Sequence, residues 1–506
     1  MLEIDITPGG DESVALSQSE QSLCNSTALN QIELNEENFV TSMSAESVLD
    51  RLSKFPYQVF VLSEYGRPIF VSCGHEDQLC SVFALIGIFV SRVKLWDDRL
   101  LQFSSFDVHV RFCHRSSIIL CIVSRSYEQL DEQLTLLFEQ IVSTLSRSQL
   151  DIVYKKKGDN YDLRRLLRGT DKFIENSVSA WHSDISLLQS AIRVIPMQAT
   201  DREYLSSTMV QCLANSKLDG VLFGLIIAHR QVAALVRLKR YVLHPRDIHI
   251  LFNMISGNNY MRITEAQTWT PICLPNFNDR GFLYAYISFP WEESAACLIL
   301  LSVKKDHFDL LNEVKKKIVE KLECNVKFFV NFKSCIDDPI PFNVSQVGAN
   351  SDLLWSFLYK NRISRQVCIS AAKIPLISRD ERNIIRCLYE KVTHIVQEEP
   401  HMRCLFVRRS RENILVWVTE KFELQCIFNP LVSAVAATSL VDRLLKSLKY
   451  HEQRYFILQY DLIPYYHATC NQSSSGRRNE HNLDQHHAYQ PGDHTKLIQP
   501  IAPGNA

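Results

Sequence analysis

The sequence predicts an α+β protein in which three successive domains each pack an antiparallel sheet against helices. Three observations lead to this class. One order of segments recurs three times between residues 51 and 466: two strands, a helix, two or three strands and a closing helix. Apolar residues make up 46% of the chain, which is enough to fill several cores. Both ends of the chain lack the repeated pattern, so the domains lie between two polar arms.

The first arm, residues 1–50, contains ten Asp or Glu and no Lys or Arg. Phe39 is its single aromatic residue. Such a segment cannot bury enough apolar area to offset the entropy lost on ordering, so we predict a disordered acidic arm. The arm could be inert, or it could cover a basic surface of the same chain.

The first domain is predicted over residues 51–150. Its sequence VFVLSEYGRPIFVSC indicates two strands around a turn at Gly66. Apolar residues at helical spacing over 79–90 then predict a helix, and a second helix over 130–145 closes the domain after two or three strands. The helix at 79–90 also carries Leu85 and Ile88 away from its core face. A helix that is apolar on both sides is buried on both sides, against a partner protein or against another copy of the domain in this chain.

Residues 151–200 are predicted as a basic linker with helices. Its cations are Lys155, Lys156, Lys157, Arg164, Arg165 and Arg168. This cluster could meet anionic lipid headgroups or an acidic partner. A solvated linker followed by the start of a helix explains the same residues equally well.

The second domain is predicted over residues 201–325, with a hairpin at 221–238, a helix starting near Pro245, the strands FLYAYISF and CLILLSV, and a closing helix from Phe308. A linker over 326–350 leads to the third domain, 351–466. This domain has a hairpin in LLWSFLYKNRISRQVCIS, a helix around Leu388, two or three strands and a closing helix around Leu444. Residues 467–506 are polar and without periodicity, which predicts a second disordered arm.

We find no sequence motif for catalysis or for a cofactor. The chain has no phosphate-binding GxxxxGK[ST] loop, no GxGxxG, no GxSxG and no HExxH. Cys73, His75 and Cys80 lie close together, but not at a spacing used by zinc sites. The tail histidines His481, His486 and His487 could bind a metal, although solvated imidazoles are the commoner case. We therefore predict no catalytic residue, no metal and no cofactor, while an enzyme whose site is assembled from distant residues stays open.

Charge and targeting signals restrict the binding partners and the cellular location that we expect. The net charge of −1 provides no overall attraction for nucleic acid. The longest apolar run is too short to cross a bilayer, and the N-terminus has no basic region followed by an apolar core. The fifteen cysteines are scattered, which indicates free thiols rather than disulfides. We expect a cytoplasmic protein.

Five segments resemble the SAND family, which includes the vacuolar fusion proteins of the Mon-one type. They are WTPICLPNFNDRGFLYAYISF, LHPRDIHILFNMI, YDLRRLLRGTDKF, LSEYGRPIF and FLYKNRISRQV. The resemblance extends over residues 55–456 and leaves out both arms. It implies three longin domains, in agreement with the three repeats.

The resemblance also implies a function. Such a chain forms a heterodimer with a Ccz-type protein that is itself built of longin domains, and in animals a third subunit can join. The pair is a guanine-nucleotide exchange factor for a late-endosomal Rab GTPase of the Rab-seven type. It is recruited peripherally to anionic endosomal and lysosomal (vacuolar) membranes, where it drives conversion of early to late endosomes and vacuole or lysosome fusion. An adaptor or tether with the same domains and no exchange activity is the alternative.

The resemblance further implies that the first domain contributes the Rab-binding and partner-binding surface. The residues we expect there form the hairpin turn and the outer face of the next helix: Glu64, Tyr65, Gly66, Arg67, Pro68, Leu85 and Ile88. Plain turn formation and dimer packing explain the same residues without a GTPase. The second and third domains would form the scaffold.

The stretch at 268–289 is rich in Trp, Pro, Cys, Phe and Tyr, with Asp279 and Arg280 as its only charged residues. So little titratable chemistry favours a folding signature over a ligand site. We expect Pro271 and Pro275 to fix a rigid turn before the strand FLYAYISF.

Overall fold

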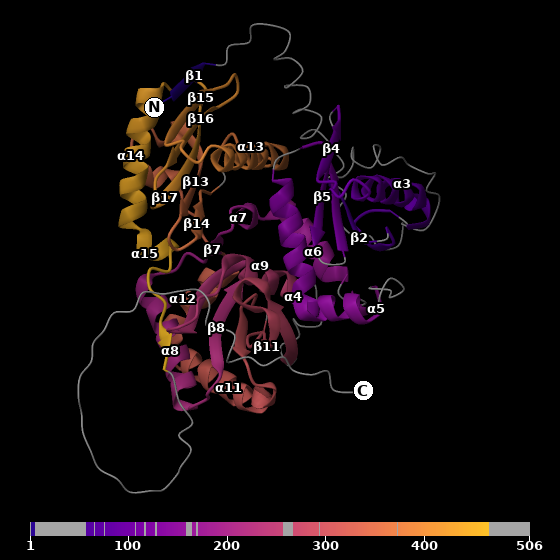
Figure 1. Cartoon of the computed structure of the whole chain (residues 1–506). Helices are drawn as coiled ribbons and strands as arrows, with labels where there is room; N and C mark the ends of the chain where they lie inside the picture. Colours follow the sequence, from indigo (N-terminus) through magenta and orange to yellow (C-terminus); the bar gives the residue numbers. More distant parts are fainter. Residues whose placement is uncertain are drawn as a thin grey trace, which may run out of the picture.

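A computed structural model describes residues 2–5 and 57–464, apart from 65, 75, 107, 116–117, 127–128, 158–163, 168, 170, 257–266, 293 and 372. Within these residues the three predicted α+β domains are present, built on one sheet of five strands and one of thirteen (Figure 1). The tail, with its histidines, lies outside the described residues, as does most of the acidic arm.

The first domain carries the five-stranded antiparallel sheet, in the order β3-β2-β6-β5-β4. Its elements are β2 (Tyr57–Ser63), β3 (Pro68–Val71), α3 (Glu76–Lys94), β4 (Gln102–Ser105), β5 (Val108–Arg115), β6 (Ile118–Ser124) and α4 (Leu130–Lys157). Successive side chains of a strand point to opposite faces, and β2 is apolar on both. Val59 and Val61 face the core beneath α4, while Phe60 and Leu62 face the core beneath α3. The sheet is therefore covered by α3 on one face and by α4 on the other.

Helices after the first domain pack onto it. The long helix α4 is interrupted at Ser146, whose φ of 50° and ψ of 154° are not helical. Then follow α5 (Arg164–Leu167), α6 (Asp171–Ser183), α7 (Ile185–Leu188) and the short strand β7 (Ile192–Val194). Trp181 of α6 is fully buried in the same core as α4, at 6.0 Å between ring centroids from Tyr57. The predicted linker is thus a set of helices that extends the first core.

The second domain repeats the plan with strand order β9-β8-β12-β11-β10. Its elements are α8 (Ala199–Asn215), β8 (Val221–Ala228), β9 (Gln231–Leu238), α9 (Pro245–Ser256), β10 (Gln267–Leu274), α10 (Pro275–Asn278), β11 (Asp279–Ser288), β12 (Cys297–Ser302), η4 (Lys305–His307), α11 (Phe308–Cys324) and α12 (Val326–Asp337). The segment predicted as a linker at 326–350 begins with α12. Phe328, Phe332 and Ile336 of α12 are buried in the core of the second domain.

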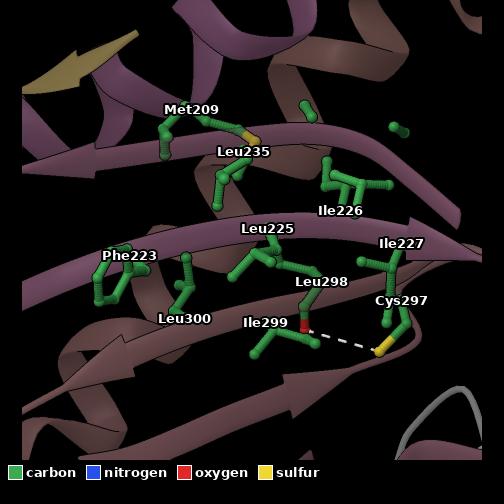
Figure 2. Close-up of a cluster of buried hydrophobic side chains, with 14 of the residues drawn as sticks. Met209, Phe223, Leu225, Ile226, Ile227, Leu235, Cys297, Leu298, Ile299 and Leu300 are labelled. Carbon is green, nitrogen blue, oxygen red and sulfur yellow. Dashed lines mark hydrogen bonds between the residues drawn. The ribbon is translucent and has the colours of Figure 1, made fainter. Parts of the chain in front are cut away.

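Gly224 in β8 shows how closely that core is packed. A Cβ built at Gly224 would lie 2.9 Å from Val236 Cγ2 and 3.2 Å from Leu300 Cδ2 and Met209 Cε. Figure 2 shows Met209 of α8 and Leu300 of β12 among the side chains that fill this region. Interiors of proteins have few voids, so a glycine is required at this strand position.

The third domain has the strand order β15-β16-β17-β13-β14. Its elements are η5 (Val344–Val347), η6 (Ser351–Leu353), β13 (Leu354–Asn361), β14 (Gln366–Ile369), α13 (Arg379–Glu398), β15 (Cys404–Arg408), β16 (Asn413–Val418), β17 (Phe422–Phe428), α14 (Ala434–Tyr450), α15 (Glu452–Tyr455) and β18 (Leu462–Ile463). Two separate clusters lie on its sheet, one containing Leu444 of α14 and one containing Leu388 of α13. A helix therefore covers each face, as in the first domain.

Strand β7 joins the second and third domains into one sheet. It pairs in parallel with β14 on one side and with β9 on the other, through registers Ile192↔Gln366 and Arg193↔Gln231. Gln366 is buried and donates from Nε2 to the carbonyl of Ile457, at 2.9 Å. The sheet of thirteen strands thus runs without a break through both domains (Figure 1).

Four residues of the acidic arm, Leu2–Asp5, form strand β1, which pairs in parallel with β15 at the edge of the third domain. The composition of the arm does not predict this strand.

A candidate interaction surface on the first domain

The β2–β3 hairpin turn is tied to the neighbouring helices. Gly66 has φ +77°, a conformation that glycine adopts without strain, and its N–H donates to the carbonyl of Ser63 at 2.9 Å. Lys94 at the end of α3 pairs with Glu64, at 2.6 Å between Nζ and Oε1. Arg164 of α5 donates from Nε to the carbonyl of Pro68, at 2.7 Å. The turn is therefore held between the ends of α3 and α5.

The turn and α3 approach each other at Gly66 and Gly87. A Cβ at Gly66 would lie 3.6 Å from the Cα of Gly87, on α3. Beside this contact is a shallow depression of about 410 Å³. Its walls include Gly66, Gly87, Ile88, Arg92 and Leu95. A Cβ at Gly87 would have nothing within 4 Å, so it is the positive φ of Gly66, and not a lack of space at Gly87, that requires glycine here.

Helix α3 covers its own sheet with one face and exposes the other. Leu79 and Phe83 are buried, whereas Leu85 is 52% and Ile88 63% exposed. Figure 1 shows α3 on the side of the five-stranded sheet opposite α4. The sequence left two explanations for the apolar outer face of α3: burial against a partner protein or against another domain of this chain. Leu85 and Ile88 are exposed in the part of the chain that the structure describes, so the second explanation is wrong there.

The exposed apolar area continues beyond the two predicted residues. Leu95 lies beside Ile88 in the depression, and the ring centroids of Phe89 and Phe103 are 5.8 Å apart. We define the α3 surface as Leu85, Ile88, Phe89, Leu95, Trp96 and Phe103, all at least 38% exposed. Single exposed apolar residues are normal, but a contiguous group of them indicates an interaction site.

Four members of the α3 surface were not predicted. A signal for some of them was present, because Leu95 and Trp96 stand in KLWDDR, a polar stretch that gives them no core to enter. Phe103 could not be found in this way, since a single apolar residue in the strand sequence QFSS does not show whether its side chain is covered. All four residues of β4 are exposed, and this edge position comes only from the sheet order.

The basic cluster is only partly described. Lys155, Lys156 and Lys157 form the end of α4, and Arg165 lies in α5, but the side chains of these four residues are outside the described part of the structure, as is Arg168 entirely. Arg164 is the exception, and it contacts the hairpin turn. The sequence predicted the basic cluster and the hairpin turn as two separate sites, whereas in the structure Arg164 of the cluster contacts Pro68 of the turn. Tyr65, in the turn, lies outside the described residues.

The equivalent helix of the second domain, α9, is covered on both sides. Ten of its residues are buried, and it packs against α4 and α6 of the preceding segment. Asn253 donates from Nδ2 to Gln140 Oε1 of α4 at 2.9 Å, and Asn176 of α6 donates to the carbonyl of Asn253 at 3.2 Å. Helix α9 therefore shows, within this chain, how helices cover the outer face that α3 leaves exposed.

The α4–α9 contact is held by the PRDIH segment that resembles the family. Arg246 forms ion pairs with Glu132 and Glu139 of α4, at 2.6 and 3.2 Å. Asp247 is fully buried, and its Oδ1 accepts the backbone and side-chain N–H groups of Asn276, both at 3.1 Å. Burial raises the pKa of Asp247 to about 7. It also raises the pKa of Glu139, which Arg246 opposes.

The prolines of the 268–289 stretch act differently from each other. Pro275 begins the short helix α10, as expected for a turn. Pro271 is not in a turn, because it lies inside strand β10 and faces Tyr284 of β11. Strand β10 is the edge of its sheet, where a residue without an N–H loses no ladder hydrogen bond. The stretch acts as a folding signature through its contacts with α9 and α4, and our expectation for Pro271 was wrong.

The described residues contain no group of three or more His, Cys, Asp and Glu side chains arranged to hold a metal ion. Cys73 is half-buried, Cys80 is exposed, and His75 is outside the described residues. The perturbed carboxylates Glu139 and Asp247 lie at a domain joint, and neither lines the depression beside α3.

Family comparison matches all three domains. The first, second and third longin domains of FUZ, MON1 and HPS1 match residues 57–176, 219–320 and 353–452. The first of these ranges ends inside α6, consistent with the packing of the linker helices on the first core.

Individual relatives match over most of the chain. "Vacuolar fusion protein MON1 homolog A" of Gallus gallus is 32% identical over 404 residues, which cover 79% of this chain and 72% of the relative. "Protein SAND" of Takifugu rubripes is 32% identical over 406 residues, 79% of this chain and 76% of the relative. "Vacuolar fusion protein MON1" of Yarrowia lipolytica is 29% identical over 413 residues, 79% of this chain and 74% of the relative.

Proposed function

Because the chain belongs to the family of MON1 and SAND proteins, which are built from three longin domains, we propose that it acts in vacuolar or lysosomal membrane fusion as a subunit of a guanine-nucleotide exchange factor. Its partner in this proposal is a Ccz-type longin protein, and its substrate is a late-endosomal Rab GTPase of the Rab-seven type. The names of its relatives support the trafficking role. Partner, GTPase and exchange activity are our extension of that role.

The observation that carries the proposal is the exposed α3 surface. The equivalent helix α9 packs on its own domain core with one face and is covered by α4 and α6 on the other, so helices can cover the outer face of a helix at this position. Burial of apolar area contributes about 25 cal/mol per Å². A longin domain of the partner can supply this cover.

The edge strand β4 offers a second contact to the same partner. Its four residues are exposed, and it lies at the end of the sheet order. The second and third domains of this chain already associate edge to edge, through β7. An unpaired edge readily accepts another strand, so sheet continuation at β4 would orient the partner next to α3.

Exchange needs no bond to be made or broken. The complex must bind the nucleotide-free GTPase more tightly than the GDP-bound form, and only this difference in affinity can shift the equilibrium. The distortion falls on the switch segments and on the Mg²⁺ contacts of the GTPase. In our proposal the hairpin turn with Glu64 and Arg67 contacts the GTPase beside the dimer interface, which the α3 surface forms.

Within the described residues, no helix is long and apolar enough to cross a bilayer. We propose peripheral recruitment, in which cations of 155–168 contribute attraction to anionic lipid at about 1 kcal/mol each. A third subunit would join the same assembly.

The test measures release of fluorescent GDP from the Rab GTPase. This chain alone, the Ccz-type partner alone, and both together are compared. We expect acceleration only with both. A Leu85→Glu variant should lose the complex and the acceleration, because a carboxylate would be placed in an apolar interface.

Leu310→Glu is the matched control. Leu310 is 50% exposed, close to the 52% of Leu85, but it lies on α11 of the second domain. This variant should behave as the wild type. An intact complex that releases no GDP would refute the exchange activity and leave the adaptor or tether as the function. Equal loss in both variants would refute the assignment to α3.

A further inference from the structure

A cavity of about 440 Å³ lies at one end of the sheet of the second domain. It is enclosed by the β8–β9 turn, the end of α9 and the segment between β11 and β12. Figure 2 shows two of its wall residues, Ile227 of β8 and Cys297 of β12, which are paired in register. Its other walls include Phe252, Phe289 and Trp291. Volumes of this size hold small ligands in other proteins.

One cation, Arg230, lines this cavity. Arg230 packs over the ring of Phe252, at 5.6 Å from its Cζ to the ring centroid. Its Nη1 donates to Asn253 Oδ1 at 2.9 Å and its Nε to Asp184 Oδ2 at 3.2 Å. Its Nη2 is buried and has no hydrogen-bond partner among the described residues. A buried guanidinium N–H without an acceptor is costly, so this atom requires an explanation.

Backbone conformation directs Arg230 to that position. His229 and Arg230 form the two-residue turn between β8 and β9, with φ of 48° and 56°. Turns of this type favour Asn and Gly, because other residues pay about 1–2 kcal/mol in the left-handed region. Two consecutive strained residues often mark a functional position.

The charges around Arg230 do not balance. Asp184 is buried and is shared by Arg230, by Arg193 at 3.5 Å and by His249 at 3.8 Å. Burial lowers the pKa of His249 to about 4. Burial opposes ionisation of Asp184, but Arg193, His249 and Arg230 outweigh it and hold the pKa of this carboxyl at about 2. Near neutral pH one carboxylate therefore faces two guanidiniums, which leaves one positive charge in excess.

We propose that this cavity binds a small carboxylate with an apolar body, its carboxylate beside the guanidinium of Arg230 and its body against Phe252, Phe289 and Trp291. The ligand class follows from the walls, in which Phe252, Phe289 and Trp291 supply apolar surface, while Arg230 and the hydroxyls of Ser256 and Ser294 supply polar groups. The site lies on the second domain, away from the α3 surface, and does not depend on exchange activity.

The test uses the full chain and two probes, octanoate and octanamide, in isothermal titration. The probes have the same body, and only octanoate is charged. We expect saturable binding of octanoate and at least tenfold weaker binding of octanamide. Ala295→Phe places a ring at the cavity wall without touching Arg230, and it should reduce octanoate binding at least tenfold.

Ala84→Phe is the control, because it makes the same substitution in the depression beside α3. It should leave octanoate binding unchanged. Arg230→Gln should reduce octanoate affinity to that of octanamide. Should this variant fail to fold, Ala295→Phe carries the test alone. Absence of saturable octanoate binding to the folded wild type would overturn the proposal, and so would equal binding by Ala295→Phe or equal affinity for the two probes.

Discussion

The substitution Asp247→Asn should stabilise the protein at high pH. Asp247 is completely buried, and its Oδ1 accepts two hydrogen bonds from Asn276 that an amide oxygen can also accept. Its pKa is about 7 in the folded chain, against 3.8 for the free side chain. A carboxyl group with a raised pKa binds a proton in the folded state while it is ionised in the unfolded state. Stability therefore falls as the pH rises from about 4 to about 7.

The magnitude follows from the two pKa values. A difference of about three units corresponds to about 4 kcal/mol, reached above pH 7. At pH 5 the same linkage amounts to less than about 2 kcal/mol. Asparagine does not titrate, so the stability of Asp247→Asn relative to the wild type should grow by about 2.5 kcal/mol between pH 5 and pH 8.

The assay is urea unfolding followed by tryptophan fluorescence at both pH values. Subtracting the wild type removes the contributions of all other titrating groups. Asp338→Asn, at an exposed position after α12, should change the unfolding free energy little at either pH. An advantage of Asp247→Asn that is the same at pH 5 and pH 8, or a loss of stability at pH 8, would refute the assignment of a raised pKa to this carboxyl.

Two further outcomes test the packing. Gly224→Val should lower the unfolding free energy by about 1–3 kcal/mol, because its Cβ would lie 2.9 Å from Val236 Cγ2. Gly87→Ala is the control: nothing lies within 4 Å of the new Cβ, so this variant should be neutral or slightly stabilising in the same urea titration. Arg246→Met should cost about 1–3 kcal/mol and expose the α4–α9 joint to limited proteolysis, because it removes the ion-pair partner of two half-buried carboxylates. Lys316→Met, which breaks the exposed pair with Glu313, should not change the cleavage pattern, and equal cleavage in both variants would contradict the role of the joint.

Local patterns were sufficient to predict the three domains. The apolar run in β2 and the helical spacing in α3 depend on residues close together in the chain; the run indicates a buried strand, and the spacing states which face of the helix is apolar. The turn at Gly66 is equally local, because it needs only one residue that tolerates positive φ. The candidate site was found in part by the same means: Leu85 and Ile88 lie off the core face of a helix that the sequence already defines.

What covers an apolar face is not a local property. The outer faces of α3 and α9 both carry apolar residues, yet only the packed chain shows α9 buried and Ile88 exposed. Strand β7 has three residues and no pattern of its own. It joins two sheets because β9 pairs with one of its edges and β14 with the other, and both strands lie more than 30 residues later in the chain. Pro271 became an edge-strand residue for the same reason, since edge or centre is decided by strand order.

The sequence by itself therefore determined the fold class, the three repeats, the folding signature around residue 275 and one face of the interaction surface. The tertiary structure decided which helices cover one another, where Arg246 finds Glu132, 114 residues earlier, and that Arg230 shares one carboxylate with Arg193. The reason is physical. Backbone periodicity is set by bonded neighbours, whereas the partners of a buried charge and the cover of an apolar face are set by side chains that meet only after the chain has folded.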